Sequence, residues 1–267
     1  MVSVLAILCV RNESVHIGPC IEDLVADGIE VHVIDHSSTD DTREIAESYV
    51  DRGVLTIDTM AWEGAFSLSA QMREKARVAA TATHDWLVHI DADERLQSPV
   101  DDETLGDAIR QADDAGSTCI NFEEFVFVPE PGSTQASPTY RSEMTDYYFF
   151  EPSKQRLMRA FKRSDDLVAW QQAGHRVTQA NQVLHPTNFI LRHYLALSAR
   201  DFKEVYRART FATEDLEKGW HGNRLAIASY AMPDRQEHGW IKSLASPASR
   251  DFDRSNPAGT HFWQWGD

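Results

Sequence analysis

The chain has 267 residues, of which 42% are hydrophobic and seven are tryptophan, and this composition excludes a disordered chain. The formal net charge is −16 and the sequence pI is near 5.0, which argues against nucleic acid and anionic lipid as main partners, because phosphate contacts need clusters of Lys and Arg. An anionic substrate would therefore need a metal ion or a local basic pocket. The three cysteines lack zinc-type spacing, which favours free thiols in a reducing cytoplasm.

The first 98 residues alternate between strand-like and helix-like segments. Apolar runs predict four strands, over residues 3–10, 30–35, 54–58 and 86–90. Apolar residues at helical spacing predict helices between them, one starting near Ile17 and ending at Gly28, one near Ile45, and one over 67–82. The first run is too short to span a membrane. This order predicts an α/β fold with a mostly parallel sheet and helices on both faces.

The remaining chain predicts an extension of the same domain, because no linker divides it. We expect helices over 101–116 and 199–218, and strands over 117–128, 155–162, around 174–177 and over 188–195. Prolines mark a long loop after residue 128. The tail after Pro233 carries Trp240, Phe252, Phe262, Trp263 and Trp265, which we expect to pack onto the domain.

Two carboxylates follow the strand over 86–90. In Asp91-Ala92-Asp93-Glu94, the residues Asp91 and Asp93 face the same side of an extended chain, so both can approach one cation. Strand ends of this kind lie at the carboxyl edge of an α/β sheet, where ligands bind, and Mg²⁺ and Mn²⁺ prefer oxygen ligands. The alternative is an acidic turn without a ligand.

Three segments in this order resemble glycosyltransferase family 2 and its GT-A fold. They are VRNES at 10–14, Asp35-His36-Ser37-Ser38-Thr39-Asp40-Asp41-Thr42, and WLVHIDADE at 86–94, which contains the DxD motif of the family. The resemblance covers residues 1–98 well and the span to about 210 less clearly. It implies a soluble, cytoplasmic, metal-dependent transferase that moves a sugar from a UDP- or GDP-sugar to a hydroxyl of a saccharide or glycolipid, with inversion. Mn²⁺ or Mg²⁺ would be the cofactor, and any membrane contact would be peripheral.

The resemblance also implies roles for the donor-side residues. The nucleoside would be bordered by Arg11, Asn12, Glu13, Asp35, His36 and Ser38. Asp91 and Ala92 would lie near the ribose or the metal, and Asp93 would coordinate the metal. On the helix over 67–82, Gln71, Arg73 and Lys75 are candidates for a donor contact, and we expect at least two of them on a solvated face.

Several donor-side alternatives stay open. Arg11 and Glu13 would otherwise form a surface ion pair, and Asp35 and Asp40 would otherwise cap a helix. His36 stands where the family usually has Asp or Asn, which leaves the nucleobase undetermined, and Ser37 replaces a common Gly.

The second half would supply the acceptor site. Residues 1–98 would form the nucleotide-sugar half, 99–220 the acceptor half, and 221–267 the packed tail. Glu124 lies in an apolar strand and is our candidate for the base that takes the acceptor proton, with His175, Asp146 and Glu151 as rivals. Solvated carboxylates on an edge strand are the alternative for Glu123 and Glu124. His193 would complete the metal shell or form a hydrogen bond within the sheet, and Arg176 would hold a phosphate or an acidic sugar.

Two other functions compete with glycosyl transfer. A sugar nucleotidyltransferase can share this sheet, but VRNES stands where such enzymes carry a glycine-rich loop with Arg or Lys. A non-catalytic nucleotide-sugar-binding module would bind the donor without turnover.

Overall fold

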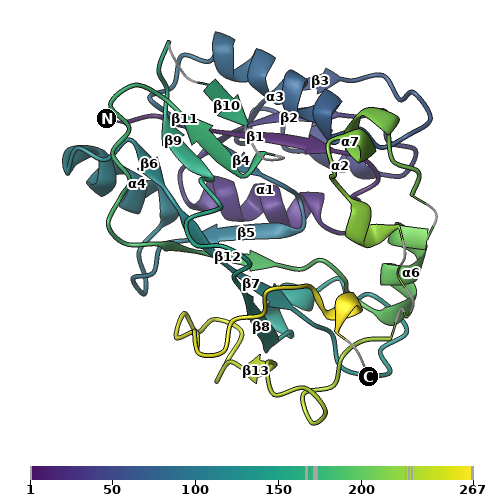
Figure 1. The fold of residues 1–267 in the computed structure, drawn as a ribbon. Coiled ribbons are helices and arrows are strands. Elements are labelled where there is room, and N and C mark those ends of the chain that lie inside the picture. The colour runs from purple at the N-terminus through teal and green to yellow at the C-terminus, as the bar shows by residue number, and fades with distance from the viewer. Residues whose placement is uncertain are drawn as a thin grey trace. The chain divides into compact units, whose positions relative to one another are not determined.

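The computed structural model describes residues 2–165, 168–170, 174–207, 209–225, 227, 229 and 231–265 (Figure 1). The chain forms two compact units. Unit 1 comprises Met1–Glu63, Ser67–Phe122 and Gln155–Ile190, and unit 2 comprises Gly64–Phe66, Glu123–Lys154 and Leu191–Asp267. The expected single domain with divisions at 98 and 220 stays a prediction.

Unit 1 is built on a six-stranded sheet with the order β3-β2-β1-β4-β9-β6. Its strands are β1 (Val4–Val10), β2 (Glu30–Asp35), β3 (Val54–Thr59), β4 (Trp86–Ile90), β6 (Cys119–Ile120) and β9 (Ala160–Lys162). The strands β3, β2, β1 and β4 run parallel, while β9 is antiparallel to both β4 and β6. The expected mostly parallel sheet is therefore confirmed.

Helices cover both faces of this sheet. In Figure 1, α1 (Ile17–Ala26) and α3 (Leu68–Thr81) lie on opposite sides of β1. Every residue of β1 is buried, and its alternate residues Leu5, Ile7 and Cys9 share a core cluster with Met72, Val78 and Ala79 of α3. This two-sided burial explains why β1 reads as a continuous apolar run. Unit 1 also contains α2 (Thr42–Glu47), α4 (Leu105–Asp114), β5 (Glu94–Gln97), and the antiparallel pair β10 (Val168–Trp170) and β11 (Arg176–Thr178).

In unit 2, four strands follow the order β13-β8-β7-β12. They are β13 (Lys242–Ser243), β8 (Asp146–Phe150), β7 (Phe122–Phe127) and β12 (Phe189–His193), with β8 antiparallel to β13 and β7. The helices are α6 (Ala199–Arg207), α7 (Thr213–Glu217) and three single 3-10 turns at Tyr140–Ser142, Gly222–Arg224 and Phe262–Gln264. No helix among the described residues is both long and apolar enough to cross a bilayer.

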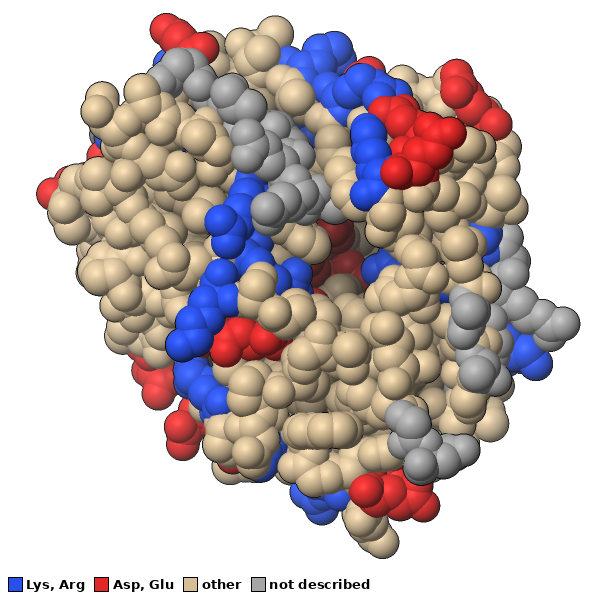
Figure 2. All heavy atoms as spheres, viewed as in Figure 1, with Lys and Arg blue, Asp and Glu red and all other residues tan. Residues whose placement is uncertain are grey.

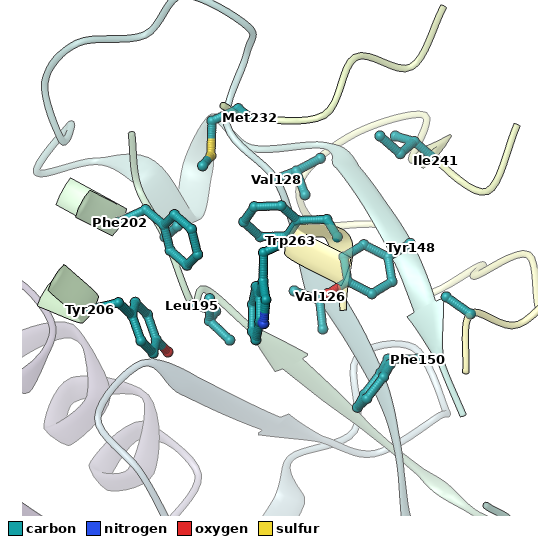
Figure 3. Close-up of a cluster of buried hydrophobic side chains, with 13 residues drawn as sticks. Val126, Val128, Tyr148, Phe150, Leu195, Phe202, Tyr206, Met232, Ile241 and Trp263 are labelled. Atoms are coloured by element: carbon teal, nitrogen blue, oxygen red, sulfur yellow. The ribbon is translucent and has the colours of Figure 1, made fainter. Parts of the chain in front are cut away.

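The tail supplies much of the core of unit 2. Trp263 lies among Val126, Leu195 and Phe202, with its ring centroid 5.4 Å from that of Phe202 (Figure 3). Phe252 stacks on Phe125 with 4.0 Å between ring centroids. Phe252, Phe262 and Trp263 are buried, whereas Trp240 is 42% exposed and its ring centroid lies 5.0 Å from that of Trp265.

Three predicted elements differ in the structure where the chain changes partner. The strand over 117–128 is broken at Asn121, because β6 pairs with β9 whereas β7 pairs with β8. The strand over 155–162 is reduced to β9, because Leu157 N–H donates to the Asn121 side chain and Met158 N–H to the His175 carbonyl. The helix over 199–218 is split, because Thr210 and Ala212 hydrogen-bond the backbone of Phe66 instead of continuing the helix.

Candidate functional site

The polar segments of the sequence meet at one edge of the sheet in unit 1. The parallel register pairs Val10 with Asp35, and Leu8 with Ile90. The loop after β1, the end of β2 and the acidic turn after β4 therefore lie at the carboxyl ends of three neighbouring strands. This is the edge at which open α/β sheets bind ligands.

Hydrogen bonds join the loop after β1 to the loop after β2. Asn12 N–H donates to Ser38 Oγ at 3.1 Å, and Asn12 Oδ1 accepts from Thr39 N–H at 2.8 Å. Glu13 N–H donates to Thr42 Oγ1 at 2.6 Å. Asn12 adopts the left-handed backbone conformation, with φ of 55°, which suits Asn. Asn12, Glu13 and Ser38 thus shape the edge through these contacts.

Asp40 holds the turn that precedes α2, whose N-cap residue is Asp41. Its carboxylate accepts from Thr42 N–H at 3.1 Å and from Ser14 N–H at 3.2 Å. Burial acts to raise the pKa of Asp40, but these hydrogen bonds from Thr42 and Ser14 outweigh it and hold the pKa below its usual value. Asp40 is therefore ionised at neutral pH and is committed to the loop.

Arg11, His36 and Trp62 form a compact group beside this loop. The Arg11 guanidinium donates to the His36 carbonyl at 2.8 Å and to the Ser37 carbonyl, and its carbon lies 3.8 Å from the Trp62 ring centroid. The His36 ring meets Trp62 edge-on, with 5.1 Å between centroids. Burial and the nearby Arg11 charge lower the pKa of His36, so its imidazole is neutral at pH 7. Trp62 is absent from the site residues predicted from the sequence, although its position after a strand end could have suggested this contact.

Asp35 is buried at the end of β2 and holds the turn that follows. Its Oδ1 accepts from Ser38 N–H at 3.1 Å, and its Oδ2 lies 3.6 Å from Arg43 Nη1. Both carboxylate oxygens of Asp35 thus face protein groups, and the donor to Oδ1 lies in the turn before α2 and not in a helix.

Helix α3 directs two of its polar residues to the sheet edge. Gln71 and Lys75 are buried and lie one turn apart, whereas Arg73 is exposed. Gln71 Nε2 lies 3.4 Å from His36 Nδ1. The expectation that at least two of the three would be solvated is wrong, because the inner face of α3 covers the ends of β2 and β4.

Lys75 is fully buried against the end of β4. Its Nζ lies 3.1 Å from Asp91 Oδ1, 3.1 Å from the Ile90 carbonyl oxygen and 3.3 Å from His89 Nε2. Burial, followed by the charges of Lys75 and Arg159, holds the pKa of His89 well below its usual value. The neutral His89 ring can therefore accept a hydrogen bond from the lysine ammonium.

Glu94 and Arg159 hold the acidic turn in place through buried contacts. Glu94 Oε2 accepts from Asp91 N–H at 3.1 Å, and Glu94 N–H donates to the Asp91 carbonyl at 3.0 Å. Glu94 also pairs with the buried Arg159, whose Nη2 lies 3.6 Å from Asp91 Oδ2. Burial acts to raise the pKa of Asp91, but Lys75 and Arg159 hold it well below its usual value. Asp91 is therefore a carboxylate with a protein cation beside each oxygen.

The segment Gly174-His175-Arg176 lies against the same residues. A Cβ on Gly174 would stand 2.7 Å from both His89 Cε1 and Met72 Sδ, so only glycine fits this close approach. His175 Nδ1 lies 3.5 Å from Arg156 Nη1. Burial, followed by the charge of Arg159, lowers the pKa of Arg156 to about 10. The close approach of Gly174 therefore brings this segment against His89 and Met72.

A divalent metal ion at the acidic turn would need several oxygen or nitrogen ligands. Among the described residues, no group of three or more His, Cys, Asp or Glu side chains is placed to hold a metal. Asp91 does not fit a metal ligand in this arrangement, because Lys75 and Arg159 flank its oxygens and would repel a second cation. A metal role for Asp93 and His193 stays a prediction.

In unit 2, the candidate base Glu124 forms a hydrogen bond with the candidate metal ligand His193. Glu124 is 5% exposed, and its Oε1 lies 2.6 Å from His193 Nδ1. The alternative of a solvated carboxylate is therefore wrong for Glu124. The alternative for His193, a hydrogen bond within the sheet, agrees with the structure. The neighbouring Glu123 pairs with Arg254 at 2.6 Å.

Comparison with known proteins adds a family to this geometry. The model of glycosyl transferase family 2 matches residues 5–213. The chain belongs to glycosyltransferase family 2. Family membership and the mainly parallel core sheet confirm the predicted α/β fold class of the GT-A type.

Individual relatives of this family 2 chain are distant. An uncharacterized glycosyltransferase of Rickettsia conorii is 32% identical over 98 residues, which is 37% of this chain and 31% of the relative, so the chain covers about a third of that protein. Residues 1–349 of S. aureus TarS in complex with UDP-GlcNAc are 15% identical, with a TM-score of 0.41 over 77% of this chain and 64% of that one. Glucosyl-3-phosphoglycerate synthase from Mycobacterium tuberculosis is 18% identical, with a TM-score of 0.30 over 54% of this chain and 47% of that one.

Proposed function

We propose that this protein transfers a sugar from a nucleoside-diphosphate sugar to a hydroxyl acceptor. One observation carries the proposal. In a family 2 chain, the Arg11–His36–Trp62 group and the Asp91–Lys75 pair stand at the ends of neighbouring strands of one compact unit. Two strand spacings separate β2 from β4, about 10 Å in all, which suits the distance from a nucleobase to a diphosphate.

The two ends of this row offer different chemistry. At the β2 end, the half-buried Trp62 ring and the neutral His36 provide aromatic surface for a nucleobase. At the β4 end, Asp91 and Lys75 provide charge for the ribose and the diphosphate. His36 replaces the acidic or amide side chain that the family usually has near the nucleobase. Binding measurements with UDP and GDP will therefore identify the nucleobase.

For the acceptor side, Glu124 is our proposed base, with His175 as the alternative. The acceptor oxygen would attack the anomeric carbon, its proton would pass to the carboxylate, and the bond to the diphosphate would break, with inversion. Support comes from the burial of Glu124 and its contact with His193 Nδ1, which hold the carboxylate in one orientation. A saccharide or glycolipid acceptor, a requirement for Mn²⁺ or Mg²⁺, and a cytoplasmic location stay predictions.

The first test measures donor binding. Titration calorimetry with UDP and GDP, in the presence of Mn²⁺, should show binding of one nucleotide to the wild type. The Trp62→Ala variant should bind it about tenfold more weakly, since one stacked base contributes roughly 1–3 kcal/mol. The matched control is Trp240→Ala, which removes an exposed tryptophan of unit 2. Absence of binding to UDP, GDP, CDP and dTDP would overturn the donor site.

The second test separates an enzyme from a binding module. With the bound nucleotide's sugar as donor, Glu124→Gln should lower turnover roughly 100-fold or more while nucleotide affinity stays unchanged, because general bases contribute 10²–10⁴-fold. Glu123→Gln, one residue away and paired with Arg254, is the control and should retain activity. Donor binding without turnover by the wild type, across mono- and disaccharide acceptors, would favour the non-catalytic module.

A further inference from the structure

Gln71 and His36 hold Trp62 through a continuous series of contacts at the β2 end of the site. Gln71 Nε2 lies 3.4 Å from His36 Nδ1. The His36 ring also hydrogen-bonds the backbone carbonyl of Ala61, the residue before Trp62, and meets the Trp62 ring edge-on with 5.1 Å between centroids. All of these residues belong to unit 1. Gln71 and His36 together form the tryptophan support.

The two hydrogen-bond partners of the His36 ring fix its proton on one nitrogen. The amide nitrogen of Gln71 can only donate, so His36 Nδ1 accepts. The ring proton therefore lies on Nε2, which donates it to the Ala61 carbonyl. Burial and the charge of Arg11 hold the pKa of His36 below its usual value, so this neutral ring is the form present at neutral pH.

A ligand can reach Trp62 but not the tryptophan support behind it. Gln71 is 6% exposed and His36 is 2% exposed, whereas Trp62 is half-buried. The Arg11 guanidinium covers one face of Trp62, with its carbon 3.8 Å from the ring centroid, so stacking by a planar ligand is confined to the opposite face. Gln71 and His36 therefore influence such a ligand through Trp62.

Trp62 depends on this support because it lies in a loop. Strand β3 ends three residues before it, and the backbone is tied to the end of β2 where Met60 N–H donates to the Asp35 carbonyl at 2.8 Å. Beyond Met60, His36 holds both the Ala61 carbonyl and the Trp62 ring. A side chain that is already ordered loses less entropy when a ligand binds, so the support favours stacking on Trp62.

We propose that Gln71 and His36 are positioning residues for the nucleotide donor, which hold Trp62 in the orientation that stacks on the nucleobase. The inference rests on the proposed function. Gln71 acts from helix α3 through the ring proton that it fixes on His36. In this role neither side chain touches the donor, in contrast to the direct contacts that the sequence predicts.

Calorimetry with the nucleotide that the wild type binds, in the presence of Mn²⁺, tests this inference. Gln71→Met keeps roughly the volume of the side chain but cannot donate to His36. It should bind the nucleotide about fivefold more weakly, which is the loss expected for one hydrogen bond. Ala80→Met, at an exposed position of the same helix, is the matched control and should bind like the wild type. Wild-type affinity in Gln71→Met would overturn the inference.

A double-mutant cycle tests whether Gln71 acts through Trp62. In the Trp62→Ala background, Gln71→Met should cause no further loss of affinity, because the side chain that it supports is absent. Charged side chains of both signs are spread over the face drawn in Figure 2, and salt screens their interactions with an anionic nucleotide. Gln71, the neutral His36 ring and Trp62 carry no charge, so the loss in Gln71→Met should be the same at low and high salt.

NMR of the ring nitrogens tests the support without a ligand. At neutral pH, His36 Nδ1 should give the signal of an unprotonated nitrogen in the wild type, and Gln71→Met should shift this signal toward the protonated value. A protonated Nδ1 in the wild type would overturn the inference.

If Gln71→Met fails to fold, His36→Phe serves instead, because Phe keeps a ring against Trp62 but cannot hydrogen-bond Ala61. It should weaken nucleotide binding when Trp62 is present and not in the Trp62→Ala background. An equal loss in the two backgrounds would overturn this inference and leave the proposed function intact. Absence of nucleotide binding by the wild type would instead remove the donor site itself.

Discussion

At the residue scale, Glu94 is the side chain that orders the acidic turn. Its carboxylate accepts from Asp91 N–H and pairs with Arg159, and its own N–H donates to the Asp91 carbonyl. The Glu94 side chain is 2% exposed, so water cannot take the place of these hydrogen-bond partners. Glu94 therefore serves the site by holding Asp91 and Arg159 in place.

The charge of Glu94 should matter greatly for stability. In Glu94→Gln the shape is kept, but Arg159 loses its closest counter-charge, and breaking a buried ion pair costs about 3–5 kcal/mol. We expect the free energy of unfolding, measured by urea titration, to fall by about 3 kcal/mol. Glu47→Gln removes the exposed Arg43–Glu47 pair and should cost less than about 1 kcal/mol. Equal losses in the two variants would contradict this account.

At the element scale, some boundaries are set by local capping residues and others by pairing with segments that are remote in sequence. Helix α3 begins after Ser67, whose Oγ accepts from Ala70 N–H at 3.1 Å, and the sequence shows this capping signal. The splits at Asn121 and near Phe211 have no such signal, because they are caused by pairing with β9, β8 and Phe66, which are remote in sequence. Local chemistry thus sets the caps, and distant partners set the breaks.

Gly174 provides an element-scale prediction, since it lets its segment lie against α3 and β4. Gly174→Ala would place a methyl group 2.7 Å from His89 Cε1 and Met72 Sδ, on a backbone with φ of +82°. Gly132→Ala is the matched control, because its φ is +85° and no atom lies within 4 Å of the added Cβ. Both variants carry the backbone strain of about 1–2 kcal/mol, and Gly174→Ala should lose a further 1–3 kcal/mol or so through overpacking. Thermal or urea unfolding measures the difference in stability between the two variants. Equal stabilities would contradict the predicted overpacking at Gly174.

At the scale of the whole molecule, several histidines are kept neutral by burial. The pKa values of His36 and His89 in unit 1 and of His221 in unit 2 all lie below the usual value. In the unfolded chain these histidines are protonated near pH 6.5, whereas in the folded chain they are protonated only at lower pH. Because the unfolded state then binds more protons, stability falls as the pH falls below about 6.5.

His221 allows a test of this pH dependence. Burial, followed by the charge of Arg224, lowers its pKa to about 4, and its ring stacks on Phe211 with 4.5 Å between centroids. Between pH 7 and pH 5 the wild type should lose about 2 kcal/mol more unfolding free energy than His221→Phe, which keeps the aromatic contact and does not titrate. Between pH 7 and pH 8 the two should change in parallel. An identical loss in both proteins down to pH 5 would contradict the lowered pKa of His221.

The sequence by itself determined the parallel core and the edge at which the site lies. The runs that became β1, β2 and β4 are apolar because two layers of helix cover them, and their polar ends must meet at one edge of a parallel sheet. Only the tertiary structure decided which side chains touch there. The pairing of Asp91 with Lys75 and Arg159, and of Glu124 with His193, joins residues at least 16 positions apart, and burial turns these charges toward each other. Periodicity reports which face of an element is buried, but it carries no information on the partner that the face will meet.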